Sequence, residues 1–235
     1  MKIENSVALV TGANRGLGLM FVNELLARGA KKVYAAARDI HSIKIPGVVA
    51  VQLDVTNDAD ITAAAAQCKD VTLLINNAGI AQFAGFLTPD SVQLARAALE
   101  TNYFGPLRLS QAFAPILATN GGGAILNVLS VASWINGAVL GVYAASKSAA
   151  WSLTNGLRNE LRAQGTQVMA LHVGFMDTDM TKGMDVPKVD PKEVVRKALD
   201  GLQADAAEVL ADAITQRVKQ GLSAEPGIYL GAVSR

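Results

Sequence analysis

Short apolar runs alternate with longer helical patterns along nearly the whole chain, and this alternation restricts the possible folds more than any other feature. The strand-like runs lie at 7–11, 31–37, 47–55, 71–76, 122–130, 166–173 and, as a short edge strand, 207–211. Most are apolar at successive positions, which is typical of parallel strands that are covered on both faces. The main helical patterns lie at 19–29, 58–70, 91–118, 142–163 and 191–202. We therefore predict a single doubly wound α/β domain over residues 1–235.

Charge and composition exclude several classes of protein. The 21 basic and 20 acidic residues form no long run of one sign, so we expect neither nucleic acid nor a membrane surface as a partner. The single cysteine, Cys68, rules out an internal disulfide framework. The N-terminus lacks the apolar core of a secretion signal, and the apolar runs fall short of the ~20 residues of a membrane span. We expect a cytoplasmic protein without a metal site.

Three glycines follow the first strand-like run in the sequence TGANRGLG. Gly12, Gly16 and Gly18 open the first helix, where free N–H groups and the positive end of the helix dipole would face a phosphate. Their spacing, G-x-x-x-G-x-G, differs from the commonest dinucleotide fingerprint. A glycine turn without a ligand is the alternative, but the position directly after a strand favours a dinucleotide site.

The end of the second strand-like run bears on the choice of cofactor. Ala37 stands where an acidic residue would bind the ribose hydroxyls of NAD, and Arg38 follows it. Arg15, in the glycine turn, could reach the same 2′-phosphate. This predicts that NADP(H) is preferred over NAD(H). The alternative is that Arg38 is a solvated charge and that Asp39 or another acid takes the ribose.

Tyr143 and Lys147 are spaced to lie on one face of a helix. A nearby ammonium favours the phenolate and lowers the pKa of a tyrosine, although such a pair also occurs by chance. Ser130, at the end of the run 122–130, would lie at the carboxyl edge of the sheet, where ligands of α/β folds bind. Asn102 lies in the long helical segment and could link Lys147 to solvent through a water molecule. Together these residues predict a site for proton transfer.

The motifs TGANRGLG, LDV, NNAG, TNYFGP, NVLS and YAASK, in this order from Val7 to about Met180, resemble the short-chain dehydrogenase/reductase family. The resemblance, which is to NADPH-dependent bacterial carbonyl reductases in particular, implies a Rossmann fold with a seven-stranded parallel sheet. It also implies Tyr143 as general acid or base, Ser130 as the group that polarises the carbonyl, Asn102 as a further catalytic residue, and Lys147 as the group that lowers the tyrosine pKa and binds the ribose.

The same resemblance implies a set of cofactor-binding residues: Gly12, Asn14, Arg15, Gly16, Leu17, Gly18, Arg38, Asp54, Val55, Asn77, Ala78, Gly79, Tyr143, Lys147 and Thr178. Within this set Asp54 and Val55 flank the adenine, and Thr178 contacts the carboxamide. The chain departs from the family pattern at Val173, where proline is usual before Gly174, and this predicts a looser turn beside the nicotinamide.

The candidate substrate wall is apolar and consists of Phe83, Phe86, Trp134, Val139, Leu140, Met176, Met180 and Met184. With a lid at about 177–190, this predicts a medium-sized uncharged ketone or aldehyde, reduced reversibly to an alcohol. These residues could instead belong to the core or to a subunit interface.

Two other functions stay open: an NAD-dependent alcohol or steroid dehydrogenase, and a non-catalytic regulator that binds NADPH. From the family resemblance we expect a homodimer or homotetramer, formed through the long helices at 91–118 and 142–163. Their exposed-looking apolar residues include Leu107, Phe113, Trp151 and Leu157.

Overall fold

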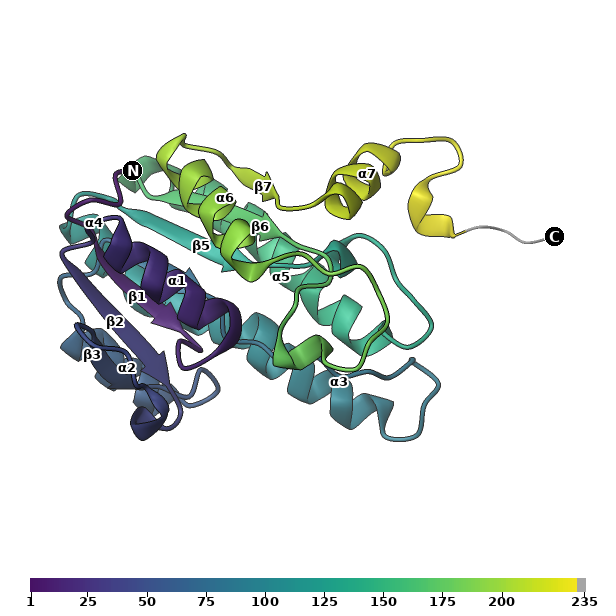
Figure 1. The fold of residues 1–235 in the computed structure, drawn as a ribbon, viewed down its shortest axis with the longest axis horizontal. Helices are drawn as coiled ribbons and strands as arrows, with labels where there is room; N and C mark the ends of the chain where they lie inside the picture. Colours follow the sequence, from purple (N-terminus) through teal and green to yellow (C-terminus); the bar gives the residue numbers. More distant parts are fainter. Residues whose placement is uncertain (232–235) are drawn as a thin grey trace.

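A parallel sheet of seven strands forms the centre of the molecule, in a computed structural model that describes residues 1–231 (Figure 1). Its order is β3-β2-β1-β4-β5-β6-β7, and every pair of neighbours is parallel. The strands are β1 (Val7–Thr11), β2 (Lys32–Ala37), β3 (Val49–Gln52), β4 (Leu73–Asn76), β5 (Ala124–Val128), β6 (Gln167–His172) and β7 (Glu208–Leu210). The predicted doubly wound fold is confirmed, including its short edge strand β7.

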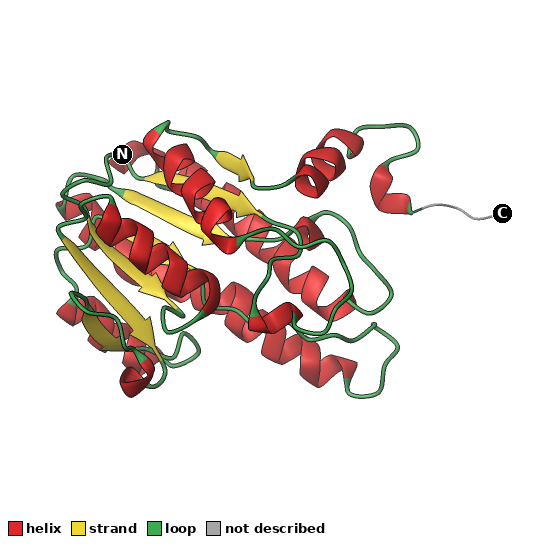
Figure 2. Ribbon diagram, in the orientation of Figure 1, coloured by secondary structure: helices red, strands yellow, loops and turns green. Residues whose placement is uncertain are grey.

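Helices cover both faces of the sheet (Figure 2). They are α1 (Gly16–Ala27), α2 (Asp58–Gln67), α3 (Ser91–Leu99), α4 (Gly105–Thr119), α5 (Gly141–Glu160), α6 (Pro191–Gln203) and α7 (Ala213–Gly221). Successive side chains of a strand point to opposite faces. Ala8 and Val10 of β1 therefore join the core under α1 and α6, whereas Val7 and Leu9 join the core under α2, α4 and α5. This is why the strands are apolar at consecutive positions.

The strand order reverses between β1 and β4. The chain winds outward from β1 to β3 on one side and from β4 to β7 on the other, so the connections that leave β1 and β4 diverge. Ligands of open α/β sheets bind in the crevice that opens at such a point. Val10 pairs with Ile75 near these strand ends, which brings the glycine turn and the NNAG motif together.

The long helical segment is not one regular helix. A π-helical turn, Glu100–Phe104, joins α3 to α4 and contains Asn102. Helix α7 was not expected from the sequence, because only two of its residues, Thr215 and Val218, are buried. A capping box between Asp212 and Thr215 fixes the start of α7 instead.

Two residues that were expected at a subunit surface belong to the core instead. Phe113 is fully buried, and Leu157 is also buried, because α4 and α5 lay these side chains on the sheet. Leu107 and Trp151 are only half-buried. The expectation of exposure was therefore wrong for Phe113 and Leu157.

Candidate active site

The glycine turn after β1 is shaped by two close approaches that differ in kind. A Cβ on Gly18 would lie 2.2 Å from the carbonyl oxygen of Gly12, so the first turn of α1 packs where no side chain fits. Gly16 has a φ of +54°, and a Cβ there would meet no atom within 4 Å. The turn is therefore tight against the protein at Gly18 and open at Gly16, as a phosphate site at a helix N-terminus requires.

The NNAG motif at the end of β4 is fastened to this turn. The hydroxyl of Thr11 accepts hydrogen bonds from the N–H groups of Asn77 at 3.0 Å and Ala78 at 2.9 Å. The side-chain amide of Asn77 donates to the carbonyl oxygen of Thr11 at 2.8 Å. Asn77 thus holds the two strand ends at a fixed separation.

A cleft of about 370 Å³ separates the glycine turn from the segment that follows β6. It is lined by Gly16, Met20, Asp177, Thr178, Asp179, Asp190, Pro191 and Lys192. The cleft brings Thr178 opposite Gly16, so two residues predicted to hold the same cofactor share one space. Arg15 lies across its edge, with Nη1 3.8 Å from Oδ2 of Asp179.

Charged groups at the ends of β2 and β3 lie close together. Arg38 is exposed after the buried Ala37. Burial raises the pKa of Asp54, but hydrogen bonds from Thr56 and the positive charge of Arg38 outweigh it, so this pKa lies below its ordinary value. The carboxylate of Asp39 accepts a hydrogen bond from the N–H of His41 at 2.9 Å and caps the turn that follows.

The remaining predicted cofactor residues differ in exposure. Asn14 is half-buried, whereas the side chains of Leu17 and Val55 are buried among apolar residues. Leu17 sits in the first turn of α1, so its side chain is part of the core and only its main chain is placed to face a phosphate.

Tyr143, Lys147 and Ser130 converge at the carboxyl edge of β5. Nζ of Lys147 lies 5.9 Å from the centre of the Tyr143 ring and donates a hydrogen bond to the carbonyl oxygen of Val128 at 2.9 Å. Ser130 begins the turn after β5, where its hydroxyl accepts from the N–H of Ala132 at 3.1 Å.

Burial dominates the titration of this pair. Desolvation raises the pKa of Tyr143 above its ordinary value, and the hydrogen bond with Ser130 offsets only part of that rise. Desolvation also lowers the pKa of Lys147 to about 8. Lys147 therefore does not bring the pKa of Tyr143 below its ordinary value in this structure, contrary to the expectation, because its ammonium is directed at a main-chain carbonyl and desolvation of the phenol dominates.

Three hydrogen bonds fix the side chain of Asn102 within the π-helical turn. Its Oδ1 accepts from the N–H of Ile80 at 2.9 Å, and its Nδ2 donates to the carbonyl oxygen of Ile80 and to Oγ of Ser146, each at 2.9 Å. A Cβ on Gly79 would lie 3.1 Å from Oδ1 of Asn102 and 3.8 Å from Nζ of Lys147. The absence of a side chain on Gly79 therefore leaves the space between Asn102 and Lys147 free. The π-helical turn that carries Asn102 is of a kind that often occurs at functional sites.

Ser146 is a residue of this cluster that the sequence analysis missed. It is fully buried, lies between Tyr143 and Lys147 in YAASK, and donates to the carbonyl oxygen of Tyr143 at 2.7 Å. The signal that could have found it is its spacing, since residues three apart share a helix face. Ser146 thereby connects Asn102 to the helix that carries the tyrosine.

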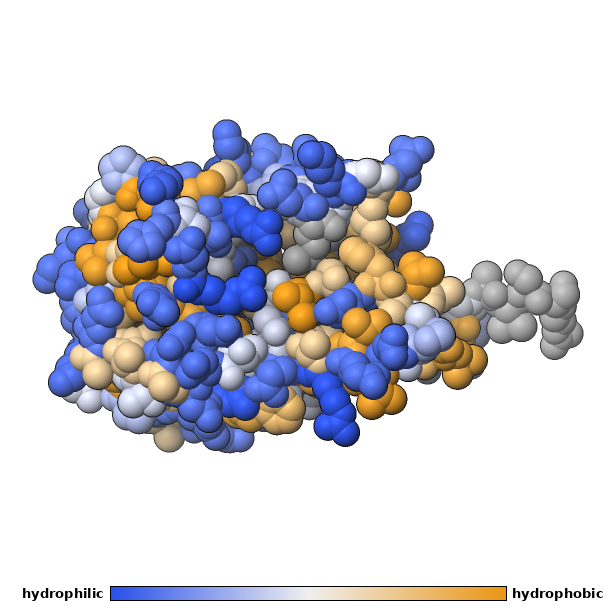
Figure 3. Space-filling model, turned by 90° about the horizontal axis from the view of Figure 1, so that it is seen from below, coloured by the Kyte–Doolittle hydropathy of each residue, from blue (hydrophilic) through white to orange (hydrophobic). Residues whose placement is uncertain are grey.

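The predicted apolar wall divides into an exposed rim and a buried part. Phe83, Phe86 and Val139 are 46%, 56% and 63% exposed, whereas Trp134 is buried. Hydrophobic side chains interrupt a largely hydrophilic surface on the face in Figure 3. Leu140, Met176 and Met184 are half-buried, and the side chain of Met180 lies outside the described part of the structure.

Comparison with known proteins decides the family. The family model described as short chain dehydrogenase matches residues 6–187. This chain belongs to that family. It is therefore an NAD(P)-dependent oxidoreductase that acts on CH–OH or C=O groups. Among the residues that the structure describes, no helix combines the length and the hydrophobicity needed to cross a membrane.

Several relatives cover most of this short-chain dehydrogenase. A short-chain dehydrogenase from Burkholderia cenocepacia J2315, solved in complex with NADP, is 42% identical, has a TM-score of 0.92, and the match covers 96% of each chain. Galactitol 2-dehydrogenase (L-tagatose-forming) from Cereibacter sphaeroides is 34% identical over an alignment of 194 residues, and the match covers 78% of this chain and 76% of that one. A 3-oxoacyl-(acyl-carrier-protein) reductase from Vibrio cholerae is 32% identical over an alignment of 194 residues, and the match covers 79% of each chain.

Proposed function

We propose that this oxidoreductase reduces a medium-sized uncharged ketone or aldehyde to an alcohol, reversibly, and that NADPH is its preferred cofactor. The observation that carries the proposal is the convergence of Tyr143, Ser130 and Lys147 beside the open glycine turn. When bound, the nicotinamide would supply the hydride in reduction and accept it in oxidation. The protein's part is then to orient the carbonyl and to supply a proton.

Tyr143 is the proposed proton donor. A pKa above the ordinary value keeps its phenol protonated at neutral pH, which suits a general acid in the direction of reduction. The hydroxyl of Ser130 would donate a hydrogen bond to the same substrate oxygen as negative charge develops there. Lys147 would hold the ribose, and Asn102 would fix the helix that carries the tyrosine through Ser146.

The ends of β1 and β2 support a preference for NADPH. Ala37 offers no carboxylate to a ribose hydroxyl, and Arg38 is exposed beside it. Asp39, the acid nearest to that position, caps its own turn. The structure of the relative from Burkholderia cenocepacia holds NADP. We propose that Arg15 and Arg38 bind the 2′-phosphate.

The rim residues support an apolar substrate. Phe83, Phe86 and Val139 offer an uncharged surface, and we propose that residues 177–190 act as a lid across the cleft of this single domain.

A second groove, of about 310 Å³, lies between α4 and α5 and includes Tyr103, Leu107 and Leu153. It supports the proposal that these helices form the contact of a homodimer or homotetramer.

The test combines turnover with cofactor binding. Oxidation of NADPH and of NADH would be followed with a panel of uncharged ketones and aldehydes. Tyr143→Phe should lower kcat ~10²–10⁴-fold, whereas Tyr229→Phe, which changes an exposed tyrosine outside the site, should leave it unchanged. Near-full turnover by Tyr143→Phe would overturn the mechanism.

Fluorescence titration tests the cofactor separately. NADPH should bind at least ~10-fold more tightly than NADH, a difference of ~1.4 kcal/mol, and Arg38→Ala should remove most of it. Equal binding of the two would overturn the preference.

Oxidation of an alcohol with NAD is a second candidate, favoured by the likeness to galactitol 2-dehydrogenase. The NADH titration separates it from the first. Binding of NADPH without turnover of any compound in the panel would instead favour a non-catalytic regulator.

A further inference from the structure

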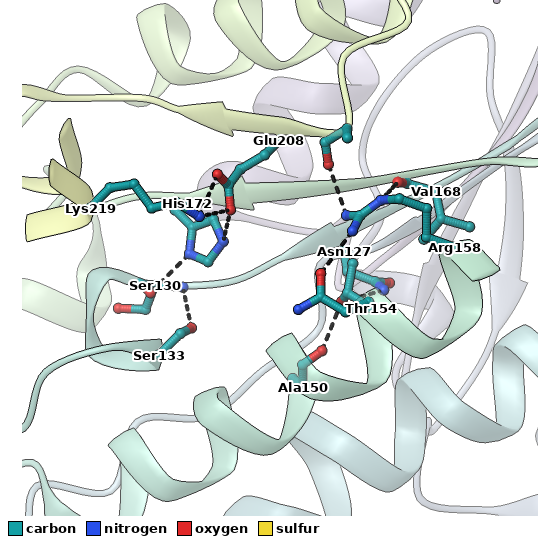
Figure 4. A network of polar contacts seen from close by, with 12 residues as sticks. Asn127, Ser130, Ser133, Ala150, Thr154, Arg158, Val168, His172, Glu208 and Lys219 are labelled. Atoms are coloured by element: carbon teal, nitrogen blue, oxygen red, sulfur yellow. Dashed lines mark hydrogen bonds and ion pairs between the residues drawn. The ribbon is translucent and has the colours of Figure 1, made fainter. Parts of the chain in front are cut away.

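We propose that His172 is a positioning residue: its imidazole fixes the main chain of the turn that carries Ser130, and Glu208 and Lys219 fix the imidazole (Figure 4). This inference rests on the proposed function, because it assigns Ser130 a role at the substrate oxygen. It adds two elements, β7 and α7, to the parts of the fold that shape the site. Both lie beyond residue 187, where the match to the family ends.

The first step is the place of His172 in the sheet. It is the last residue of β6, has no exposed surface, and follows the apolar residues of that strand. A buried imidazole has two ring nitrogens, and each needs a polar partner. Nδ1 lies at hydrogen-bonding distance from a main-chain oxygen of another element, whereas Nε2 makes no hydrogen bond among the described residues and lies within ion-pair distance of a carboxylate.

One nitrogen faces the catalytic turn. Nδ1 lies 3.3 Å from the carbonyl oxygen of Ser130. On either side the main chain is already tied to the strand, since Leu129 donates to the carbonyl oxygen of Leu171 at 2.8 Å and Val131 donates to that of Val173 at 2.9 Å. Between these two hydrogen bonds, Ser130 contacts β6 through the imidazole of His172.

The other nitrogen faces a carboxylate. Nε2 lies 3.3 Å from Oε1 of Glu208 on β7. Nζ of Lys219 on α7 lies 3.0 Å from Oε1 and 2.8 Å from Oε2 of the same carboxylate. The contact with His172 and the charge of Lys219 hold the pKa of Glu208 at about 2, although burial alone would raise it. The partner of the imidazole is therefore a carboxylate throughout the neutral range.

The plane of the imidazole is fixed as well. It stacks on the ring of Trp134 with 3.8 Å between ring centres and 21° between planes, and Trp134 ends the turn that Ser130 begins. Nζ of Lys219 lies 5.0 Å from the centre of the Trp134 ring. His172 thus touches both ends of the turn, and a change in the imidazole should move the Ser130 hydroxyl.

The test needs variants that separate positioning from stability. His172→Phe keeps a flat ring for the stack and removes both nitrogens. His172→Asn keeps an N–H close to the place of Nδ1 and loses the contact with Glu208. Each would be made in the natural chain and in a Ser130→Ala background. His41→Asn changes the other histidine, which lies exposed on a turn, and is the matched control.

The expected result is a loss that depends on Ser130. His172→Phe should lower kcat about tenfold, the scale of one misaligned hydrogen bond, and leave the Kd of NADPH unchanged. It should cause no further loss in the Ser130→Ala background, and His172→Asn should recover most of the activity. Equal losses in both backgrounds, or a lower melting temperature with kcat unchanged, would overturn the proposal.

A readout without substrate keeps the two proposals apart. Because the hydrogen bond with Ser130 lowers the pKa of Tyr143, His172→Phe should raise that pKa as Ser130→Ala does. Ultraviolet titration of each protein against its Tyr143→Phe counterpart isolates this phenol. If the natural chain reduces no carbonyl, the proposed function fails, and this titration still decides the positioning: an unchanged Tyr143 pKa in folded His172→Phe would reject it.

Discussion

The ammonium of Lys147 lies 2.9 Å from the main-chain carbonyl oxygen of Val128, so the lysine is directed at the floor of the site rather than at the phenol of Tyr143. Burial of the side chain lowers its pKa to about 8. The folded protein thus holds a cation where water cannot solvate it well, and this arrangement has a measurable effect on stability.

We expect stability to depend on pH through Lys147. Between pH 8 and about 10.5 the unfolded chain keeps the proton that the folded chain has lost, so the free energy of unfolding rises with pH in that window. Below pH 8 the full cost of burying the cation is present. Across this window the free energy of unfolding of the natural chain should rise by ~3 kcal/mol relative to that of Lys147→Met. Urea unfolding of both proteins at pH 7, 8, 9 and 10 measures the difference; a difference that stays constant would contradict this account.

The two glycines of the turn should respond differently to alanine. In Gly18→Ala the new Cβ meets the Gly12 carbonyl at 2.2 Å, so the cofactor-free protein should unfold several degrees lower. In Gly16→Ala the Cβ enters open space, and the positive φ should cost only ~1 kcal/mol. Its main effect should be weaker NADPH binding. Melting curves and cofactor titrations of both variants decide; equal loss of stability in the two would argue against the distinction.

Asp179 should compete with the cofactor for Arg15. Its carboxylate lies 3.8 Å from the guanidinium, and both groups are well exposed. Asp179→Asn should therefore tighten NADPH binding a few-fold at low salt, and the gain should shrink at high salt because exposed charges are screened. NADH binding should change less. Asp185→Asn, an exposed acid of the same segment, is the control. Weaker NADPH binding by Asp179→Asn would assign that residue a role in holding the cofactor instead.

The fold and the convergence of Tyr143, Lys147 and Ser130 were predictable because their signals are local. Apolar runs define the strands, and the carboxyl ends of parallel strands must share one edge. The spacing of Tyr143 and Lys147 fixes their common helix face in the same way. No tertiary information is needed for any of these inferences.

The network around His172 was not predictable for the opposite reason. Its members come from β6, β7 and α7, and the sequence does not single out His172, Glu208 or Lys219 as a candidate site residue. The direction of the Tyr143 pKa shift was not predictable for the same reason. The spacing between Tyr143 and Lys147 is visible in the sequence, but the desolvation that raises the pKa depends on distant segments. Phe113 and Leu157 show the same limit: their apolar character was evident, but which face packs on the sheet was not.

The link between Asn102 and Ser146 should be separable from the anchoring of Asn102 to Ile80. Ser146→Ala removes one partner of Nδ2, which keeps its bond to the Ile80 carbonyl, so it should cost ~1 kcal/mol of stability. Asn102→Ala removes three hydrogen bonds and should cost ~2–4 kcal/mol. Ser223→Ala changes an exposed serine outside the site and should be neutral.

Activity distinguishes the two variants further. Because Ser146 also bonds the carbonyl of Tyr143, its loss should lower kcat a few-fold without changing the Kd of NADPH, whereas Asn102→Ala disturbs the space beside Gly79 and Lys147 and should lower kcat more. Chemical denaturation and steady-state kinetics of the three proteins measure these effects. If Ser146→Ala matched the natural chain in both, the π-helical turn would be held by Ile80 alone, and the link from Asn102 to the tyrosine helix would have no functional weight.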